Sequence, residues 1–284
     1  MKLEFFIIDP QNDFCKPGGA LYVGDPTAVI YTEGASKDSM VLANTIKRLS
    51  KNISAIHVTL DTHHWMHIAH PSFWVDAQRN HPKPFTLIFL DDLNNGKWMT
   101  TNPAFMTRAR KYVETLEANK RYVLCIWPPH CLIGTPGHNV VDPIREVLLD
   151  WEKEKESNRM VDYVTKGSNL WTEHYSAVQA DVPDSTDPTT QLNRKEGSLI
   201  DLLSKADIIA ISGQALSHCV ANTIRDVANT FGEENIEKMV LLEDTTSPVG
   251  DLPGSTMFKD MADGFVKEMT GRGMKVSKAD DFLR

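Results

Sequence analysis

The sequence predicts an α/β fold: a doubly wound, mostly parallel sheet with helices on both of its faces. Short, largely apolar runs typical of buried strands alternate along the chain with segments whose apolar residues recur at helical spacing. This alternation is typical of βαβ units, which build parallel sheets that are covered on both faces. The chain has 284 residues, so we expect a single domain over residues 1–284 that carries insertions.

The individual elements follow from these patterns. The expected strands are residues 3–8, 53–60, 122–126, 160–164, 207–211 and 239–242. The expected helices are residues 38–50, 103–118, 139–156, a segment from about 193, a segment from about 217, and residues 254–270. Asn102 and Pro103 suit the start of the second helix, while Asn193 and Glu196 form a capping-box pattern for the fourth.

Two stretches break the alternation of strands and helices. Residues 76–119 separate two expected strands by more than a simple crossover. Residues 181–192 are rich in Asp, Pro, Ser and Thr, which is typical of a loop. We expect both to be insertions within the same domain.

Composition narrows the function classes. The chain has 30 basic and 38 acidic residues, a formal net charge of -8, and no dense Lys/Arg run, so we expect neither a nucleic-acid nor a membrane partner. No signal-peptide pattern and no run long enough to span a bilayer is present. The four cysteines contain no CxxC pair, which argues against a disulfide framework or a cysteine zinc site. A reducing, cytoplasmic setting is expected, and assembly into a homo-oligomer stays open.

Reactive side chains follow the expected strands. They are Asp9, Asp61, His63, His130, Lys166 and Cys219. Ligands of open parallel sheets bind beyond the carboxyl ends of the strands, so these side chains are expected in one cleft.

Cys219 is the candidate nucleophile, because it falls in the first turn of an expected helix. The free N–H groups there lower a thiol pKa and can hold a developing oxyanion. Asp9 is expected to take the thiol proton and later deliver it to a leaving amine. Lys166 is expected to stabilise the thiolate and to set the pKa of Asp9.

A metal site is expected from Asp61 and His63, which point to the same side if the strand continues through them. A carboxylate and an imidazole suit zinc or a similar divalent ion. His130, which Pro128 and Pro129 precede, is the expected third ligand. Further histidines nearby leave another assignment open: His64, His67, His70 and His81.

These segments together resemble the nicotinamidase/isochorismatase-like cysteine hydrolases. The matching segments are Asp9–Phe14 (D-x-Q-N-D-F), Asp61–His63 (D-x-H), Trp127–Cys131 with Gly134–Gly137 (W-P-x-H-C-x-x-G-T-x-G), Lys166-Gly167, and Gly213–Val220 (G-x-A-x-x-x-C-V). They occur in chain order from residue 9 to about 225 and are specific as a set.

The resemblance implies metal-dependent hydrolysis of a pyridine carboxamide, such as nicotinamide, to the acid and ammonia through a thioester. It implies that Ala215 and Cys219 N–H groups form the oxyanion hole, with a cis peptide before Ala215. One divalent ion, zinc first and Mn or Fe as alternatives, would bind the ring nitrogen. Phe14 and Trp127 would flank the ring, and His218 would adjoin it.

This chain also departs from the family pattern. It is longer, it has Ser217-His218 where an acidic residue and Tyr are common, and it has Gln214 where an aliphatic residue is common. Two alternatives therefore stay open. One is a related amidase that acts on another small amide, and the other is a catalytically idle metal-binding protein on the same fold. The isochorismatase branch is disfavoured, since it needs no metal and lacks W-P-x-H-C.

Overall fold

The computed structural model describes residues 1–24, 32–120, 122–154, 158–192, 197–251 and 254–284. Its centre is a sheet of six parallel strands in the order β10-β9-β8-β1-β2-β7. The strands are β1 Leu3–Ile8, β2 Ile53–Asp61, β7 Asp162–Lys166, β8 Ile208–Gly213, β9 Met239–Leu242 and β10 Lys275–Ser277. The chain runs outward from β1 to one edge and then from β8 to the other, which confirms the doubly wound α/β prediction.

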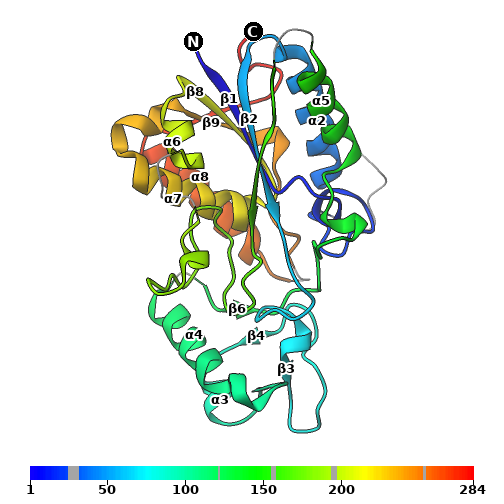
Figure 1. The fold of residues 1–284 in the computed structure, drawn as a ribbon, viewed down its shortest axis with the longest axis vertical. Helices are drawn as coiled ribbons and strands as arrows, with labels where there is room; N and C mark the ends of the chain where they lie inside the picture. The colour runs from blue at the N-terminus through cyan, green and yellow to red at the C-terminus, as the bar shows by residue number, and fades with distance from the viewer. Residues whose placement is uncertain (25–31, 121, 155–157, 193–196, 252–253) are drawn as a thin grey trace.

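Helices cover both faces of this sheet (Figure 1). Helices α2 and α5 lie together on one face, and α6, α7 and α8 lie on the other. Their bounds are α2 Gly34–Leu49, α5 Asp142–Lys153, α6 Leu199–Ser204, α7 Ala221–Phe231 and α8 Met257–Gly271. Every residue of β1 is buried, because the sheet has no solvent-facing side at its centre, and this explains why residues 3–8 are apolar apart from Glu4.

A smaller part of the molecule lies beyond the carboxyl ends of β1 and β2 (Figure 1). Its elements are short apart from α4: β3 Trp74–Val75, β4 Leu87–Ile88, α3 Leu90–Asn94, β5 Met99–Thr100, α4 Met106–Ala118 and β6 Leu124–Cys125. Most of it is the expected insertion at 76–119. Asn102 accepts a hydrogen bond from Ala104 N–H at 3.1 Å, as predicted for a helix start, but Pro103–Phe105 is a 3-10 turn that precedes α4.

One expected strand of the main sheet was wrong. Within residues 122–126, only β6 is a strand, and it pairs antiparallel with β4 in a separate two-stranded sheet. The apolar run is buried against the smaller part rather than against the main sheet. Apolar content alone therefore indicated burial but not the pairing partner.

The remaining predictions differ in detail. The strand β10, the short helix α1 Asn12–Cys15 and several 3-10 turns were not predicted. Residues 181–192 are irregular apart from the turn Pro188–Thr190, as expected for a loop. The capping box at Asn193 and Glu196 lies outside the described residues. Among the described residues, no helix combines the length and apolarity that crossing a membrane requires.

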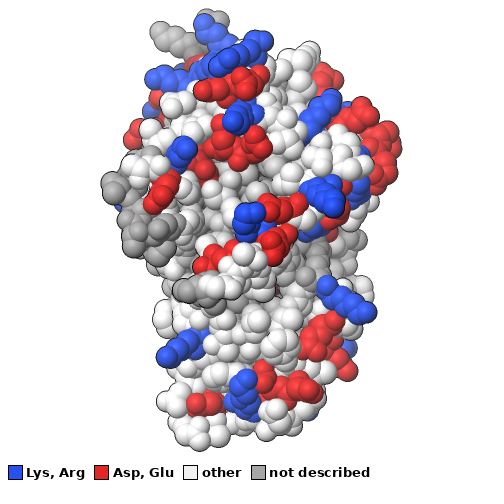
Figure 2. All heavy atoms as spheres, turned by 180° about the vertical axis from the view of Figure 1, so that it is seen from behind, with Lys and Arg blue, Asp and Glu red and all other residues white. Residues whose placement is uncertain are grey.

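The surface carries charge of both signs. On the side opposite to Figure 1, acidic and basic side chains are interspersed, and the band between the two parts of the molecule is largely uncharged (Figure 2). This distribution accords with the modest net charge of -8.

Candidate active site

Four adjacent strands bring the predicted catalytic groups together. Asp9 follows β1, Asp61 ends β2, Lys166 ends β7, and Cys219 follows β8. These strands are neighbours in the order β8-β1-β2-β7, so their carboxyl ends form one continuous edge. The prediction that functional groups gather at this edge is confirmed for these four residues.

Lys166 lies at the centre of the cluster. Its Nζ is 2.8 Å from Asp9 Oδ2, 3.2 Å from Asp61 Oδ1 and 3.5 Å from Cys219 Sγ. All four side chains are buried. One ammonium group thus neutralises two carboxylates and faces the thiol, which compensates for the cost of burying charge here.

The charge states follow from burial and these contacts. Burial raises the pKa of Asp9, and the Lys166 ammonium only partly opposes that rise. Burial likewise raises the pKa of the Cys219 thiol against the pull of Lys166. Burial opposes the charged form of Lys166, yet the Asp61 and Asp9 carboxylates hold its pKa well above the ordinary value. The cluster therefore combines a permanent cation with two groups, Asp9 and Cys219, between which a proton can move.

Thr59 and Gln11 hold Asp9 and Asp61 in place. Thr59 Oγ1 donates to Asp9 Oδ1 at 2.5 Å, which leaves Oδ2 for Lys166. Gln11 Nε2 donates to Asp61 C=O, and Asp61 N–H donates to Gln11 Oε1, both at 2.7 Å. These bonds hold the ends of β1 and β2 in register, so Asp9 and Asp61 meet Lys166 without a flexible loop between them.

Cys219 sits on a tightly built turn. Gly213 has φ +113, and a Cβ there would lie 2.0 Å from Ile8 C=O, so only glycine fits. The Gln214–Ala215 peptide is cis, as the resemblance implied. A π-helical turn, Leu216–Val220, then carries Cys219 and leads into α7. Among the described residues, no acceptor pairs with the Ala215 N–H, which is free to face a developing oxyanion beside Cys219.

Gln214 is anchored from its other side. Its Nε2 donates to Asp38 Oδ2 at 2.9 Å, and its Oε1 accepts from Ser247 N–H at 3.2 Å. Ser247 Oγ also donates to Asp38 Oδ2, at 2.7 Å. Gln214 and Asp38 are both buried. The polar residue that departs from the family pattern therefore turns away from the thiol and ties the cis turn to α2.

The predicted metal ligands also meet. The candidate ligand atoms of Asp61, His63 and His130 all lie within 4.8 Å of one another. His63 Nε2 is 3.0 Å and His130 Nε2 is 3.4 Å from Asp61 Oδ2. His130 Nδ1 lies 2.8 Å from Pro128 C=O, so Nδ1 donates there and Nε2 keeps its lone pair for a metal. Two imidazoles and a carboxylate fit a divalent ion such as zinc.

His130 does not reach this site from a strand of the main sheet, as had been expected. Its segment instead pairs with His63: His63 N–H donates to Cys131 C=O at 3.1 Å, and Ile133 N–H donates to His63 C=O at 3.0 Å. The predicted grouping is right, and its predicted structural origin is wrong.

The neighbouring histidines divide into two kinds. His67 and His70 are buried against His63, with which they form a second compact set of candidate ligands. Both ring nitrogens of His67 already have backbone partners, the Ala69 N–H and the Thr172 C=O. Burial lowers the pKa of His70 to about 2, so this imidazole is neutral. His64 is exposed and His81 bonds Trp74 C=O, so neither joins the site.

A small cavity adjoins the thiol. Phe14, Trp127 and His218, for which substrate contacts are expected, line it together with Cys219. The sequence reasoning missed Glu173 and Tyr175, which line the same cavity. The Glu173 carboxylate is buried, its Oε1 is 4.0 Å from His63 Nε2, and its Oε2 has no hydrogen-bond partner. The sequence signal that could have identified Glu173 and Tyr175 is their place shortly after Lys166, on the connection that leaves the end of β7.

Comparison with solved structures shows which fold this is. The yeast nicotinamidase is 19% identical, with a TM-score of 0.61 over 96% of this chain and 98% of that chain. A nicotinamidase/pyrazinamidase from Acinetobacter baumanii is 20% identical, with a TM-score of 0.60 over 99% of this chain and 98% of that chain. A Pyrococcus horikoshii pyrazinamidase, solved in complex with zinc, is 19% identical, with a TM-score of 0.54 over 98% and 99%.

These likenesses establish that the chain has the α/β fold of the nicotinamidases and pyrazinamidases. No protein-family model and no curated protein sequence matches it. The assignment of activity therefore depends on the geometry of the site.

Proposed function

We propose that this chain is a nicotinamidase-like amidase that uses Cys219 as its nucleophile, Asp9 as its acid and base, and Lys166 as its electrostatic support. The observation that carries the proposal is the buried cluster in which Lys166 Nζ contacts Asp9, Asp61 and the Cys219 thiol. Burying this set costs free energy, so a purely structural role would not favour it. The fold shared with solved nicotinamidases supports the same reading.

The reaction begins with a proton transfer. The Cys219 thiol gives its proton to Asp9, and the thiolate, stabilised by Lys166, attacks the carboxamide carbon. The carbonyl π electrons move onto oxygen, and the N–H groups of Ala215 and Cys219 hold that oxyanion. Asp9 then protonates the amide nitrogen, the C–N bond breaks, and ammonia leaves a thioester on Cys219.

Hydrolysis of the thioester reverses these roles. Asp9 takes a proton from water, whose oxygen attacks the thioester carbon in the same oxyanion hole. The C–S bond breaks, the carboxylic acid is released, and Cys219 regains its proton. The atoms balance as amide plus water to acid plus ammonia.

Asp61, His63 and His130 would hold one divalent ion, zinc first and Mn or Fe as alternatives. Such an ion would supply an open coordination position for a ring nitrogen beside the thiol. Phe14 and Trp127 line that space and would contact the ring, and His218 adjoins it. Nicotinamide, hydrolysed to nicotinate, is therefore the proposed substrate.

Two observations favour keeping a second small amide as the alternative substrate. His218 replaces the common Tyr beside the nucleophile, and Glu173 places an unpaired carboxylate oxygen at the cavity. Both alter polarity around the substrate rather than the chemistry at Cys219. A catalytically idle metal-binding protein is the other alternative, and measured turnover of any amide would exclude it.

The test is ammonia release from nicotinamide, pyrazinamide and aliphatic amides by the purified protein, with Cys219→Ala as the control. We expect turnover of the aromatic carboxamides by the parent protein alone. Equal ammonia release by Cys219→Ala would reject the nucleophile, and metal binding without turnover of any amide would reject the amidase.

A further inference from the structure

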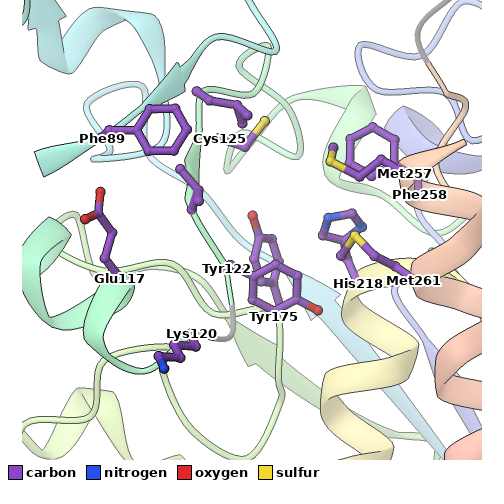
Figure 3. A pocket seen from close by; sticks show the side chains of 12 residues that line it. Phe89, Glu117, Lys120, Tyr122, Cys125, Tyr175, His218, Met257, Phe258 and Met261 are labelled. Carbon is purple, nitrogen blue, oxygen red and sulfur yellow. The ribbon is translucent and has the colours of Figure 1, made fainter. Parts of the chain in front are cut away.

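A second, larger cavity lies next to the catalytic one. Its volume is about 490 Å³, against about 20 Å³ for the space at the thiol. His218 and Tyr175 line both cavities and so form a common wall. Figure 3 shows His218 with the α8 side chains Met257, Phe258 and Met261 at one side, and Phe89, Glu117 and Lys120 at the other. The insertion thus builds a wall of this cavity.

The lining of this second cavity is mainly apolar. Phe89, Met257, Phe258 and Met261 contribute aromatic rings and thioethers. Phe89 is 43% exposed and Met257 is 44% exposed, so part of this apolar lining faces solvent. Methionine and aromatic side chains adapt well to a flat apolar ligand. A ligand here would cover apolar surface that the protein itself leaves open.

His218 supplies a polar group inside this lining. Its Nδ1 lies 2.8 Å from Ser217 Oγ, and that oxygen accepts from Val249 N–H at 3.1 Å. Among the described residues, Nδ1 is the one acceptor within hydrogen-bond reach of the Ser217 hydroxyl, so we assign the hydroxyl proton to this bond and the ring proton to Nε2. Burial lowers the pKa of His218 to about 3, so the ring is neutral.

Nε2 is consequently a neutral donor. Among the described residues, the structure gives it no acceptor. Tyr122 stacks on the same ring, with centroids 5.6 Å apart, and Phe258 meets it at 5.2 Å, so the ring is held in place.

Among the lining residues that the structure describes, charge lies at the rim. Lys120 is exposed, and Glu117 Oε1 already accepts from Leu90 N–H at 2.7 Å. Glu117 lies in the last turn of α4 and Lys120 just after it, so the described part of the lining carries no net charge for an ion. The lining therefore favours an uncharged ligand.

We propose that this cavity binds an uncharged aromatic group that carries a carbonyl or similar hydrogen-bond acceptor, and that its occupant alters catalysis through His218 and Tyr175. The effect on turnover rests on the proposed amidase function, whereas the binding does not. The same chemistry has two possible sources. The group is either the distal part of a carboxamide substrate longer than nicotinamide, or a separate small molecule.

The binding test uses acetophenone as the probe and ethylbenzene as the matched molecule without the acceptor. Calorimetric titration of the parent protein should show acetophenone binding. Met261→Trp, which fills the cavity, should weaken that binding at least about tenfold. Lys267→Trp, on α8 but outside the cavity, should bind as the parent protein does. Met257→Trp, at an exposed position, replaces Met261→Trp if circular dichroism shows that the latter does not fold.

Two results would overturn the site. They are no acetophenone binding by the parent protein, and equal binding by a folded cavity-filling variant. Ethylbenzene should bind at least about threefold more weakly than acetophenone. Equal affinity of the two probes would overturn the role of His218 as donor.

The source is decided by kinetics with 5-phenylnicotinamide and nicotinamide. A kcat/KM ratio in favour of the longer amide, at least about tenfold in the parent protein and lost in Met261→Trp, would identify the substrate's own distal group. A changed KM for nicotinamide at saturating acetophenone, without that ratio, would identify a separate ligand. The absence of both effects would overturn the proposed coupling between the cavity and catalysis. Failure of the parent protein to release ammonia from any amide would instead reject the proposed function, and acetophenone binding would remain measurable.

Discussion

Replacement of Gln214 by leucine tests how the oxyanion turn is held. Gln214 precedes Ala215, whose N–H is proposed to bind the oxyanion, and its side chain bonds Asp38 and Ser247. Leucine keeps most of the side-chain bulk and removes both bonds. We therefore expect losses in both stability and turnover.

The magnitude follows from the two contacts. The bond from Gln214 Nε2 to the buried Asp38 carboxylate is charge-assisted, and a bond to a charged group contributes about 1.5–3 kcal/mol. The bond from Ser247 N–H is neutral and contributes about 1 kcal/mol. The free energy of unfolding should fall by about 2–4 kcal/mol. Ala215 keeps its N–H, but the Gln214 bonds that hold the turn before it are lost. We therefore expect kcat to fall about 10- to 100-fold, which does not exceed the loss that follows deletion of an oxyanion donor.

The effect depends on pH through Asp38. Burial raises the pKa of Asp38 from 3.8 to about 6, against the hydrogen bonds from Ser247 and Gln214. Between these two values the folded state binds the proton more tightly than the unfolded chain does. Stability from this group is therefore lost as pH rises through that window, by about 3 kcal/mol in the parent protein. Gln214→Leu removes a bond to the charged form, so it should destabilise more at about pH 8 than at about pH 5.

The assay is urea unfolding at these two pH values, together with kcat for nicotinamide from ammonia release. The matched control is Asp38→Asn, alone and combined with Gln214→Leu. The double variant leaves no carboxylate at position 38 to lose a partner, so its cost should be smaller than the sum of the single costs. Parent-like stability and kcat in Gln214→Leu, or strictly additive costs, would refute the anchoring role.

Four further outcomes are expected. Cys219→Ala should lose turnover by about four orders of magnitude or more, about 6 kcal/mol of barrier, while circular dichroism remains unchanged; a tenth of parent turnover would exclude it as nucleophile. Elemental analysis of untagged protein should find about one divalent metal per chain, and His63→Ala should lose it; metal retained at full stoichiometry by a folded His63→Ala would contradict the assigned ligands. Nicotinamide should exceed benzamide in kcat/KM by several kcal/mol of transition-state binding, and equal values would show that the ring nitrogen is not held. His57 lies 3.2 Å from Glu4 and 2.9 Å from Asp162; burial lowers the pKa of His57, but these carboxylates raise it by more, so the net pKa is raised. The free energy of unfolding should therefore fall as pH rises from about 6.5 through that raised pKa. Thermal unfolding of His57→Gln should lack this pH dependence.

The sequence alone determined the fold class and the composition of the candidate catalytic group. Largely apolar runs at 3–8 and 207–211 indicate strands buried on both faces, and such strands belong to parallel sheets. Since the carboxyl ends of those strands share an edge, the residues after them had to be near one another. Asp9, Lys166 and Cys219 were identifiable for this reason.

The tertiary structure decided the partners of irregular segments. Residues 122–126 are as apolar as a strand of the main sheet, but they pair with β4 in the smaller part. His130 reaches Asp61 because its loop pairs with His63, a contact between segments far apart in the chain. Periodicity describes which side chains are buried and carries no information about which distant segment buries them.

The same limit explains the residues that were missed. No strand or helix pattern marks the irregular segment that contains Glu173 and Tyr175. Asp38 lies on a face of α2 that looks like ordinary core. Their roles arise from what they contact: Glu173 from the cavity at the thiol, and Asp38 from Gln214 on the opposite side of the turn. Local sequence determined the reactive groups at the strand ends, because strand direction places them. Only folding decided the contacts that orient these groups, because those contacts join side chains that no local pattern relates.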